Sequence, residues 1–159
     1  MSEVRHAVLQ FRPEKSRLRE SLARLRAHLE ALRPHAPQVV VLPEAALTGY
    51  FLQGGVRELA LTRHELLELL VGVYEKVGWE GVLDVVVGFY ERDEGAYYNS
   101  AAYLELPHRV VHVGDLALVQ VVAERRREWL RRLVHRVRIE DVDPGEEARL
   151  RACRQQALL

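Results

Sequence analysis

The chain of 159 residues contains little cysteine and lysine, and it has no long apolar run. Its single cysteine, Cys153, has no second thiol with which to form an internal disulfide, as is typical of proteins from a reducing compartment. No apolar stretch approaches the roughly 20 residues of a membrane-spanning helix. The amino-terminal segment contains Glu3, Arg5 and His6, so it does not resemble a signal peptide. We therefore expect a cytoplasmic protein.

Neither acidic nor basic residues are in excess. The chain has 23 basic and 23 acidic residues, so its formal net charge is zero. No overall electrostatic field favours nucleic acid or an anionic membrane surface, and we expect neither as a partner. Lysine is nearly absent, because Lys15 and Lys76 are the only two. Few residues of this chain can therefore supply a catalytic lysine.

Apolar residues make up 48% of the chain, enough for one globular domain with a core. Residues 6–10 and 38–42 have the length and apolar character of buried strands. Between them, residues 14–32 carry a leucine at every third or fourth position, which predicts a helix with one apolar face. These leucines are Leu18, Leu22, Leu25, Leu29 and Leu32. Pro34 and Pro37 are expected to end this helix.

A capping-box pattern at residues 62–65 predicts the start of a second helix, which continues to residue 77. Three more strands are expected after it, with turns between them, at residues 84–90, 97–104 and 109–113. The order β-α-β-α-β-β-β predicts an α/β fold, with a helix-covered sheet whose last three strands form an antiparallel meander.

Residues 114–159 differ from the rest, because they contain ten arginines and no lysine. We expect helices over residues 119–137 and 146–158, forming a helical carboxy-terminal appendage. The arginine run at residues 125–127 would suit a phosphate backbone. Glu124 and Glu128 flank it, however, which favours a solvated helix face.

The strongest local signal for chemistry is Glu44, which follows the predicted strand at residues 38–42. An acid at the carboxyl end of a buried strand lies where open α/β sheets place their sites, and it suits a general base. Taken by its spacing alone, Glu44 is more readily interpreted as an ordinary surface-loop glutamate.

Three blocks add a family resemblance. The segment VVVLPEAALTGY (39–50) resembles the region around the catalytic glutamate of the nitrilase superfamily of carbon–nitrogen hydrolases. The segment VVVGFYERDEGAYYNSAAYLE (85–105) resembles that family's next strand pair with its Tyr-Asn-Ser-Ala signature. VRHAVLQFRPEKSRLRESLARL (4–25) resembles the family's first strand and helix. The blocks occur in the family's order, so residues 1–113 resemble the amino-terminal half of such a domain.

The resemblance implies a partial α-β-β-α sandwich and hydrolysis of non-peptide C–N bonds in amides, nitriles or related compounds. In that family a cysteine attacks, a glutamate acts as base and a lysine stabilises the oxyanion. Glu44 matches the base, Tyr50 a loop aromatic near the pocket, and Asn99 with Ser100 the residues that support the site. Tyr50, Asn99 and Ser100 are also consistent with packing and turn support alone. No metal or organic cofactor is implied.

The family's other two catalytic residues have no counterpart here. After the strand at residues 109–113 the family has a Tyr-Arg-Lys segment, whereas this chain continues with Gly114 and has no lysine beyond Lys76. Cys153 lies in a predicted helix between arginines, outside any strand-end motif, and is interpreted as an incidental thiol. His108 and His112 are a conceivable metal pair but have no evident third ligand.

The sequence thus predicts a carbon–nitrogen hydrolase by descent that is truncated and inactive, or nearly so, alone. Its substrate would be a small amide or nitrile-like molecule. Three accounts remain open: an interrupted gene, a split enzyme completed by a second chain, and a truncated relative reused as a non-catalytic binding or assembly module. In each we expect a homo-oligomer or a complementing chain, because half a sandwich leaves sheet edges without partners.

Overall fold

The computed structural model describes residues 4–50, 55–114 and 137–139. Its centre is a mixed sheet with the strand order β1-β2-β3-β4-β5, and the short strand β6 also pairs with β4. The strands are β1 (His6–Val8), β2 (Val39–Val41), β3 (Leu83–Asp93), β4 (Ala96–Leu106), β5 (Arg109–Gly114) and β6 (Val137–Ile139). The helices are α1 (Leu18–Leu32), α2 (Val56–Leu59) and α3 (Arg63–Val77), with a 3₁₀ turn at Arg33–His35. The predicted α/β class is confirmed.

The sheet changes from parallel to antiparallel at β3. Strands β1, β2 and β3 pair in parallel, with α1 and α3 as the crossover connections. Strands β3, β4 and β5 pair antiparallel, so the predicted meander is confirmed. The turn predicted between residues 104 and 109 is present and lies between β4 and β5. Because β1, β2 and β3 run in the same direction, their carboxyl ends meet at one edge of the sheet.

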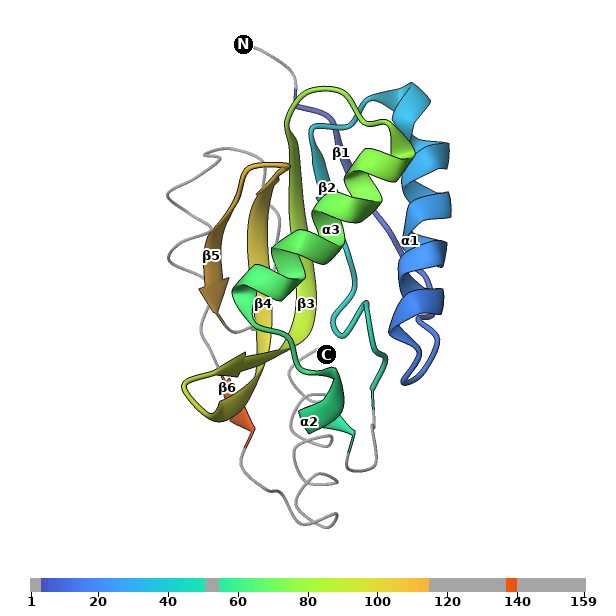
Figure 1. Ribbon diagram of the computed structural model, residues 1–159. Coiled ribbons are helices and arrows are strands. Elements are labelled where there is room, and N and C mark those ends of the chain that lie inside the picture. The colour runs from blue at the N-terminus through green and yellow to red at the C-terminus, as the bar shows by residue number, and fades with distance from the viewer. Residues whose placement is uncertain (1–3, 51–54, 115–136, 140–159) are drawn as a thin grey trace, which may run out of the picture.

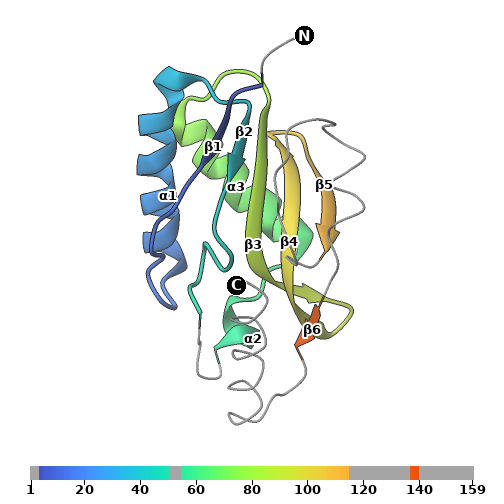
Figure 2. The ribbon, with the colours of Figure 1, turned by 180° about the vertical axis from the view of Figure 1, so that it is seen from behind.

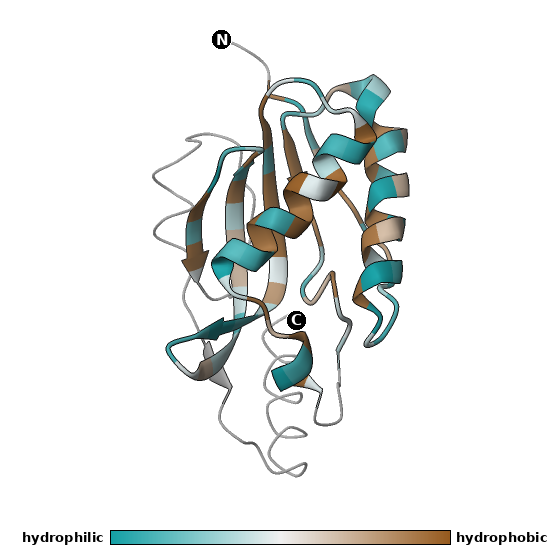
Figure 3. Cartoon of the chain, in the orientation of Figure 1, coloured by the Kyte–Doolittle hydropathy of each residue, from teal (hydrophilic) through white to brown (hydrophobic). Residues whose placement is uncertain are grey.

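Helices α1 and α3 cover one face of the sheet. Figure 1 shows both in front of the strands, and Figure 2 shows the sheet in front of them from behind. The main core lies between these layers and includes Leu25 and Leu29 of the predicted leucine stripe. In Figure 3 strand β3 is largely brown (hydrophobic), whereas α1 alternates between teal and brown, as an amphipathic helix should. Burial of each such leucine contributes about 1.5–3 kcal/mol to folding.

The opposite face of the sheet carries smaller apolar clusters. Val41, Val86 and Tyr103 form one of them, in a single row across β2, β3 and β4. Helix α2 packs at the end of this face against Tyr90 and Tyr97. No helix in the described part of the chain combines the length and apolarity that a membrane crossing needs.

Three details differ from the sequence-based expectation. Helix α1 begins at Leu18 instead of residue 14, because Ser16 adopts a left-handed conformation (φ 58°) that interrupts a helix. Helix α2 lies in a stretch before the capping box for which no helix or strand was predicted. Residue 137 was expected to end a helix, but it begins strand β6, which pairs with β4. The rest of the predicted appendage, including Cys153, lies outside the described residues.

The predicted capping box at the start of α3 is confirmed. The backbone N–H of Glu65 donates to Thr62 Oγ1 at 3.2 Å, and the backbone N–H of Thr62 donates to Glu65 Oε2 at 2.7 Å. We expect Thr62→Ala to lower the free energy of unfolding by about 1 kcal/mol, because one amide loses its partner. Urea denaturation of both proteins measures this difference, and an unchanged midpoint would contradict the assignment of the cap.

Glu65 also makes stability depend on pH. The backbone N–H of Thr62, then its hydroxyl, and then Arg92 hold the pKa of Glu65 below its ordinary value of 4.5. A lowered folded-state pKa stabilises the protein above the unfolded-state pKa, and this contribution is lost as pH falls through the folded-state pKa. The stability difference between the wild type and Glu65→Gln should therefore be present at neutral pH and shrink below pH 4.5.

Candidate active site

Glu44 lies just beyond β2, at the edge where the parallel strands end. The backbone N–H of Leu42 donates to Val86 O at 2.8 Å, so the pairing of β2 with β3 continues almost to Glu44. The side chain of Glu44 is half-buried. The structure therefore places this carboxylate at the carboxyl end of a central strand, where α/β sheets place their ligands.

A tight, buried turn fixes the backbone on the carboxyl side of Glu44. Ala45 has a left-handed conformation (φ 49°), and its carbonyl accepts hydrogen bonds from the N–H groups of Thr48 (3.2 Å) and Gly49 (2.8 Å). Thr48 is buried, and Gly49 is also left-handed (φ 74°). A non-glycine residue in this conformation is strained, and such strain is held where the surroundings determine it, often at functional sites.

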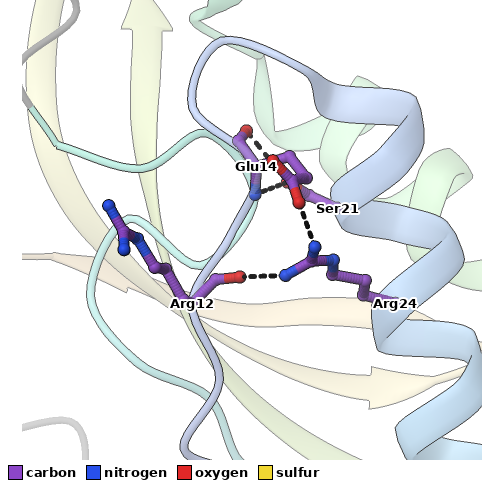
Figure 4. A network of polar contacts seen from close by, with 4 residues as sticks. All are labelled: Arg12, Glu14, Ser21 and Arg24. Atoms are coloured by element: carbon purple, nitrogen blue, oxygen red, sulfur yellow. Dashed lines mark hydrogen bonds and ion pairs between the residues drawn. The ribbon is translucent and has the colours of Figure 1, made fainter.

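The loop before α1 braces this turn. The N–H of Ser16 donates to Thr48 O at 3.0 Å. The loop is in turn held to α1 by the polar network of Figure 4. There, Ser21 Oγ accepts from the backbone N–H of Glu14 at 3.1 Å, while Arg24 pairs with the Glu14 carboxylate and donates to Arg12 O at 3.0 Å. Glu44 is thus carried by a loop whose buried turn is held by hydrogen bonds to the segment before α1.

Asn99 from β4 reaches the same carboxylate. Its Nδ2 donates to Glu44 Oε1 at 2.6 Å, a short contact typical of a hydrogen bond to a charged group. Asn99 is 8% exposed and lies opposite Tyr90 of β3. Two residues that are 55 positions apart in the sequence therefore converge at one point, and the amide fixes the orientation of the acid.

Ser100 does not join this pair. Successive residues of a strand point to opposite faces, so Ser100 lies on the helix-covered face. Its Oγ donates at 2.7 Å to Glu91 Oε2, and Arg63 Nε donates at 3.0 Å to Glu91 Oε1. Glu91 is completely buried, whereas the side chain of Arg63 is half-exposed. The serine therefore supports a buried ion pair that ties the start of α3 to the sheet.

The sequence analysis did not single out Glu91. The available signal was its spacing, because Glu91 continues the alternating buried positions of Val85, Val87 and Phe89 on one strand face. A charged residue in such a register must find partners inside the protein. The expected strand ended at residue 90, so this signal was missed.

Of the remaining candidates, Tyr50, His108 and His112 lie among the described residues, and Cys153 lies outside them. Tyr50 ends the described part of the loop and is 40% exposed. His108 lies in the exposed turn before β5, and His112 lies within β5. Across residues 4–50, 55–114 and 137–139, no group of three side chains is arranged to hold a metal ion. Lys15 is exposed in the loop before α1, and Lys76 lies in the last turn of α3.

Comparison with known proteins finds relatives by structure only. No family model and no curated protein sequence matches the chain. Its structure is similar to the crystal structure of an N-terminal amidase, with a TM-score of 0.57 and 23% identity over 69% of this chain and 27% of that one. A carbon–nitrogen hydrolase from Helicobacter pylori G27 gives a TM-score of 0.56 and 20% identity over 73% of this chain and 41% of that one.

A glutamine-dependent NAD(+) synthetase from Cytophaga hutchinsonii gives a TM-score of 0.56 and 15% identity over 74% of this chain and 20% of that one. The chain spans less than half the length of each of these structures, and at such identities the common feature is the fold. The predicted resemblance is therefore confirmed at the level of the fold. Across about seven tenths of its length, this chain has the fold of part of a carbon–nitrogen hydrolase of the nitrilase type.

Proposed function

We propose that this chain contributes the general-base side of a carbon–nitrogen hydrolase site, with Glu44 as the base. The observation that carries this proposal is the Glu44–Asn99 hydrogen bond at the carboxyl edge of a sheet with the hydrolase fold. A carboxylate that is half-buried and fixed in orientation is suited to accept a proton from a nearby thiol.

With Glu44 as the base, amide hydrolysis would proceed through a thioester. Glu44 takes the proton of a thiol, and the thiolate attacks the carbonyl carbon of an amide, forming a C–S bond. The C–N bond then breaks, and the protonated Glu44 returns the proton to the departing nitrogen. Water then attacks the thioester while Glu44 accepts its proton, the C–S bond breaks, and Glu44 returns that proton to the thiolate, so the enzyme is restored. Asn99 acts here as a positioning residue, because it holds Glu44 and does not itself react.

The thiol and a cation for the oxyanion are needed in addition. The lysines of the sequence are Lys15 and Lys76, neither at the family's position, and Cys153 matches no strand-end motif. We therefore propose that both groups come from polypeptide outside these 159 residues. The competing function is a non-catalytic assembly module, which is favoured by the same missing lysine.

A hydrolysis assay of the isolated chain tests whether the thiol and the cation come from another polypeptide. We expect no hydrolysis of simple amides above the uncatalysed rate, because loss of the nucleophile in a hydrolase costs about six orders of magnitude in turnover. Cys153→Ser should change nothing. Robust turnover that Cys153→Ser abolishes would show that the chain carries its own nucleophile, and it would contradict the proposal.

The complementary experiment purifies the chain from its native source together with any polypeptide that binds it. A split enzyme predicts a second polypeptide, identified by mass spectrometry, whose presence restores amide hydrolysis. A co-purified assembly without hydrolytic activity on amides, nitriles or ureido acids would favour the assembly module instead.

A further inference from the structure

Strand β1 forms one edge of the sheet, and within the described part of the chain no strand pairs with its outer side. On its inner side the carbonyl of Arg5 accepts from the N–H of Val39 at 3.3 Å, and the N–H of Leu9 donates to a carbonyl of β2 at 2.9 Å. In this parallel pair every second residue of β1 bonds to β2, so the backbone N–H and C=O groups of His6 and Val8 point to the outer side. Such a row of backbone groups is a template for a further strand.

A groove of about 370 Å³ lies beside this edge. It is lined by residues 4–7 and by Leu32, His35 and Pro37, which come from the end of α1 and the segment after it. Figures 1 and 2 both show α1 alongside the β1 side of the sheet. The space next to the outer side of β1 is therefore bounded by side chains, as the site of a bound extended peptide needs to be.

The lining of the groove is basic. Arg5, His6 and His35 belong to it, and none of its residues is acidic. Arg5 Nη1 donates to His35 O at 3.0 Å, which holds the guanidinium between β1 and the end of α1. A guanidinium has five N–H groups, so others can donate to a carboxylate of a ligand. The charge that complements this groove is therefore negative.

The two faces of an added strand would contact different side chains. Ala7 and Leu9 pack against the main core, so the odd-numbered residues of β1 and its flanks, Arg5 included, face the helices. His6 and Val8 face the opposite side, where Val8 is 61% exposed. We propose that β1 binds an extended acidic segment of a partner protein as an added strand, with acidic side chains against Arg5 and apolar side chains against Val8.

A second copy of this chain is the other occupant that such an edge could take. Residues 4–9 contain Arg5 and His6 and no acid, so a second β1 lacks the negative charge that complements the groove. The groove lies at the amino end of β1, whereas Glu44 follows the carboxyl end of β2. This inference therefore goes beyond the proposed function and does not depend on it.

Three capped peptides test the proposal by NMR titration of the full ¹⁵N-labelled chain. Val-Glu-Val-Glu-Val should bind saturably and shift the backbone amide signals of His6 and Val8. Val-Lys-Val-Lys-Val reverses the charge and should bind at least about tenfold more weakly. Val-Glu-Pro-Glu-Val keeps the charge but lacks the central N–H that faces β1, and it should bind about fivefold more weakly, the effect of one lost hydrogen bond.

Two pairs of variants separate the backbone from the charge. Val8→Pro removes an outward N–H that takes no part in pairing with β2, so it should abolish peptide binding, whereas Val8→Thr should retain it. Arg5→Gln should weaken binding of the acidic peptide at least about tenfold and remove its advantage over the lysine peptide. Arg19→Gln changes an exposed arginine of α1 outside the groove and should leave binding unchanged.

The wild-type chain alone can overturn the inference, even if a variant does not fold. Equal binding of the three peptides, or binding without shifts at His6 and Val8, would show that neither the charge nor the backbone of this edge recognises the ligand. A wild-type dimer in sedimentation that Val8→Pro dissociates would assign the edge to a second copy, and it would equally contradict the proposal.

Discussion

Replacement of Glu44 by glutamine should lower the turnover of the assembled enzyme by about 10²- to 10⁴-fold, the contribution of a positioned general base. Glutamine has nearly the same shape, and its Oε1 accepts the hydrogen bond from Asn99 Nδ2 as the carboxylate does. It cannot take a proton from a thiol near neutral pH. The loss should therefore appear in kcat, with folding and the affinity for substrate changed much less.

Glu58→Gln is the matched control for this substitution. Glu58 is an exposed acid in α2, and its neutralisation makes the same change in net charge. It should leave kcat within about twofold, as surface charges away from a reacting group contribute little. If the two variants lost activity equally, the effect would come from charge or stability, and Glu44 would not be the base.

A second large effect is expected for Arg63→Ala, which should lower the free energy of unfolding by about 2–3 kcal/mol. Arg63 Nε donates to Glu91 at 3.0 Å, and the Glu91 carboxylate is completely buried. Removal of the arginine takes away a cation that pairs with this buried carboxylate. The half-exposed position of Arg63 lets water replace part of the interaction, which keeps the effect below that of a fully buried pair. Urea denaturation measures the change.

Arg26→Ala is the corresponding control. Arg26 pairs with Glu30 at 2.7 Å, but both side chains are nearly half-exposed, and such pairs contribute about 0.3–0.5 kcal/mol. Combining Arg63→Ala with Ser100→Ala tests whether the three residues act as one network, because contacts to a common partner should make the two effects non-additive. Equal losses in Arg63→Ala and Arg26→Ala would show that burial of Glu91 does not matter.

The sequence predicts most of this fold because its elements have strong local signals. The leucine stripe of α1, the capping box at residues 62–65 and the apolar run before Glu44 each depend on neighbours in the sequence. Helix α2 has only four residues and no such periodicity, so it was not predicted. Strand β6 forms by pairing with β4, a contact between distant residues that no local pattern encodes.

The candidate site likewise contains a residue that the sequence predicts and contacts that it does not predict. Glu44 is predictable because it directly follows a buried strand. The pairing of Asn99 with Glu44 depends on the register that sets Asn99 opposite Tyr90, so residue spacing alone does not reveal it. Ser100 was expected to support the same site, but the strand pleat turns it to the other face, where it serves Glu91. Family resemblance predicts which residues belong to the site, and the structure shows which of them contact one another.

Trapping of the reaction intermediate tests most directly whether the acid described here serves a nucleophile from elsewhere. The co-purified assembly would be mixed with an activated ester of a carboxylic acid, quenched, digested and analysed by mass spectrometry for an acyl group on sulfur. The result we predict is an acylated cysteine outside these 159 residues, formed much more slowly when Glu44 is glutamine. Acyl label on Cys153 itself, formed at an equal rate in both proteins, would contradict the account.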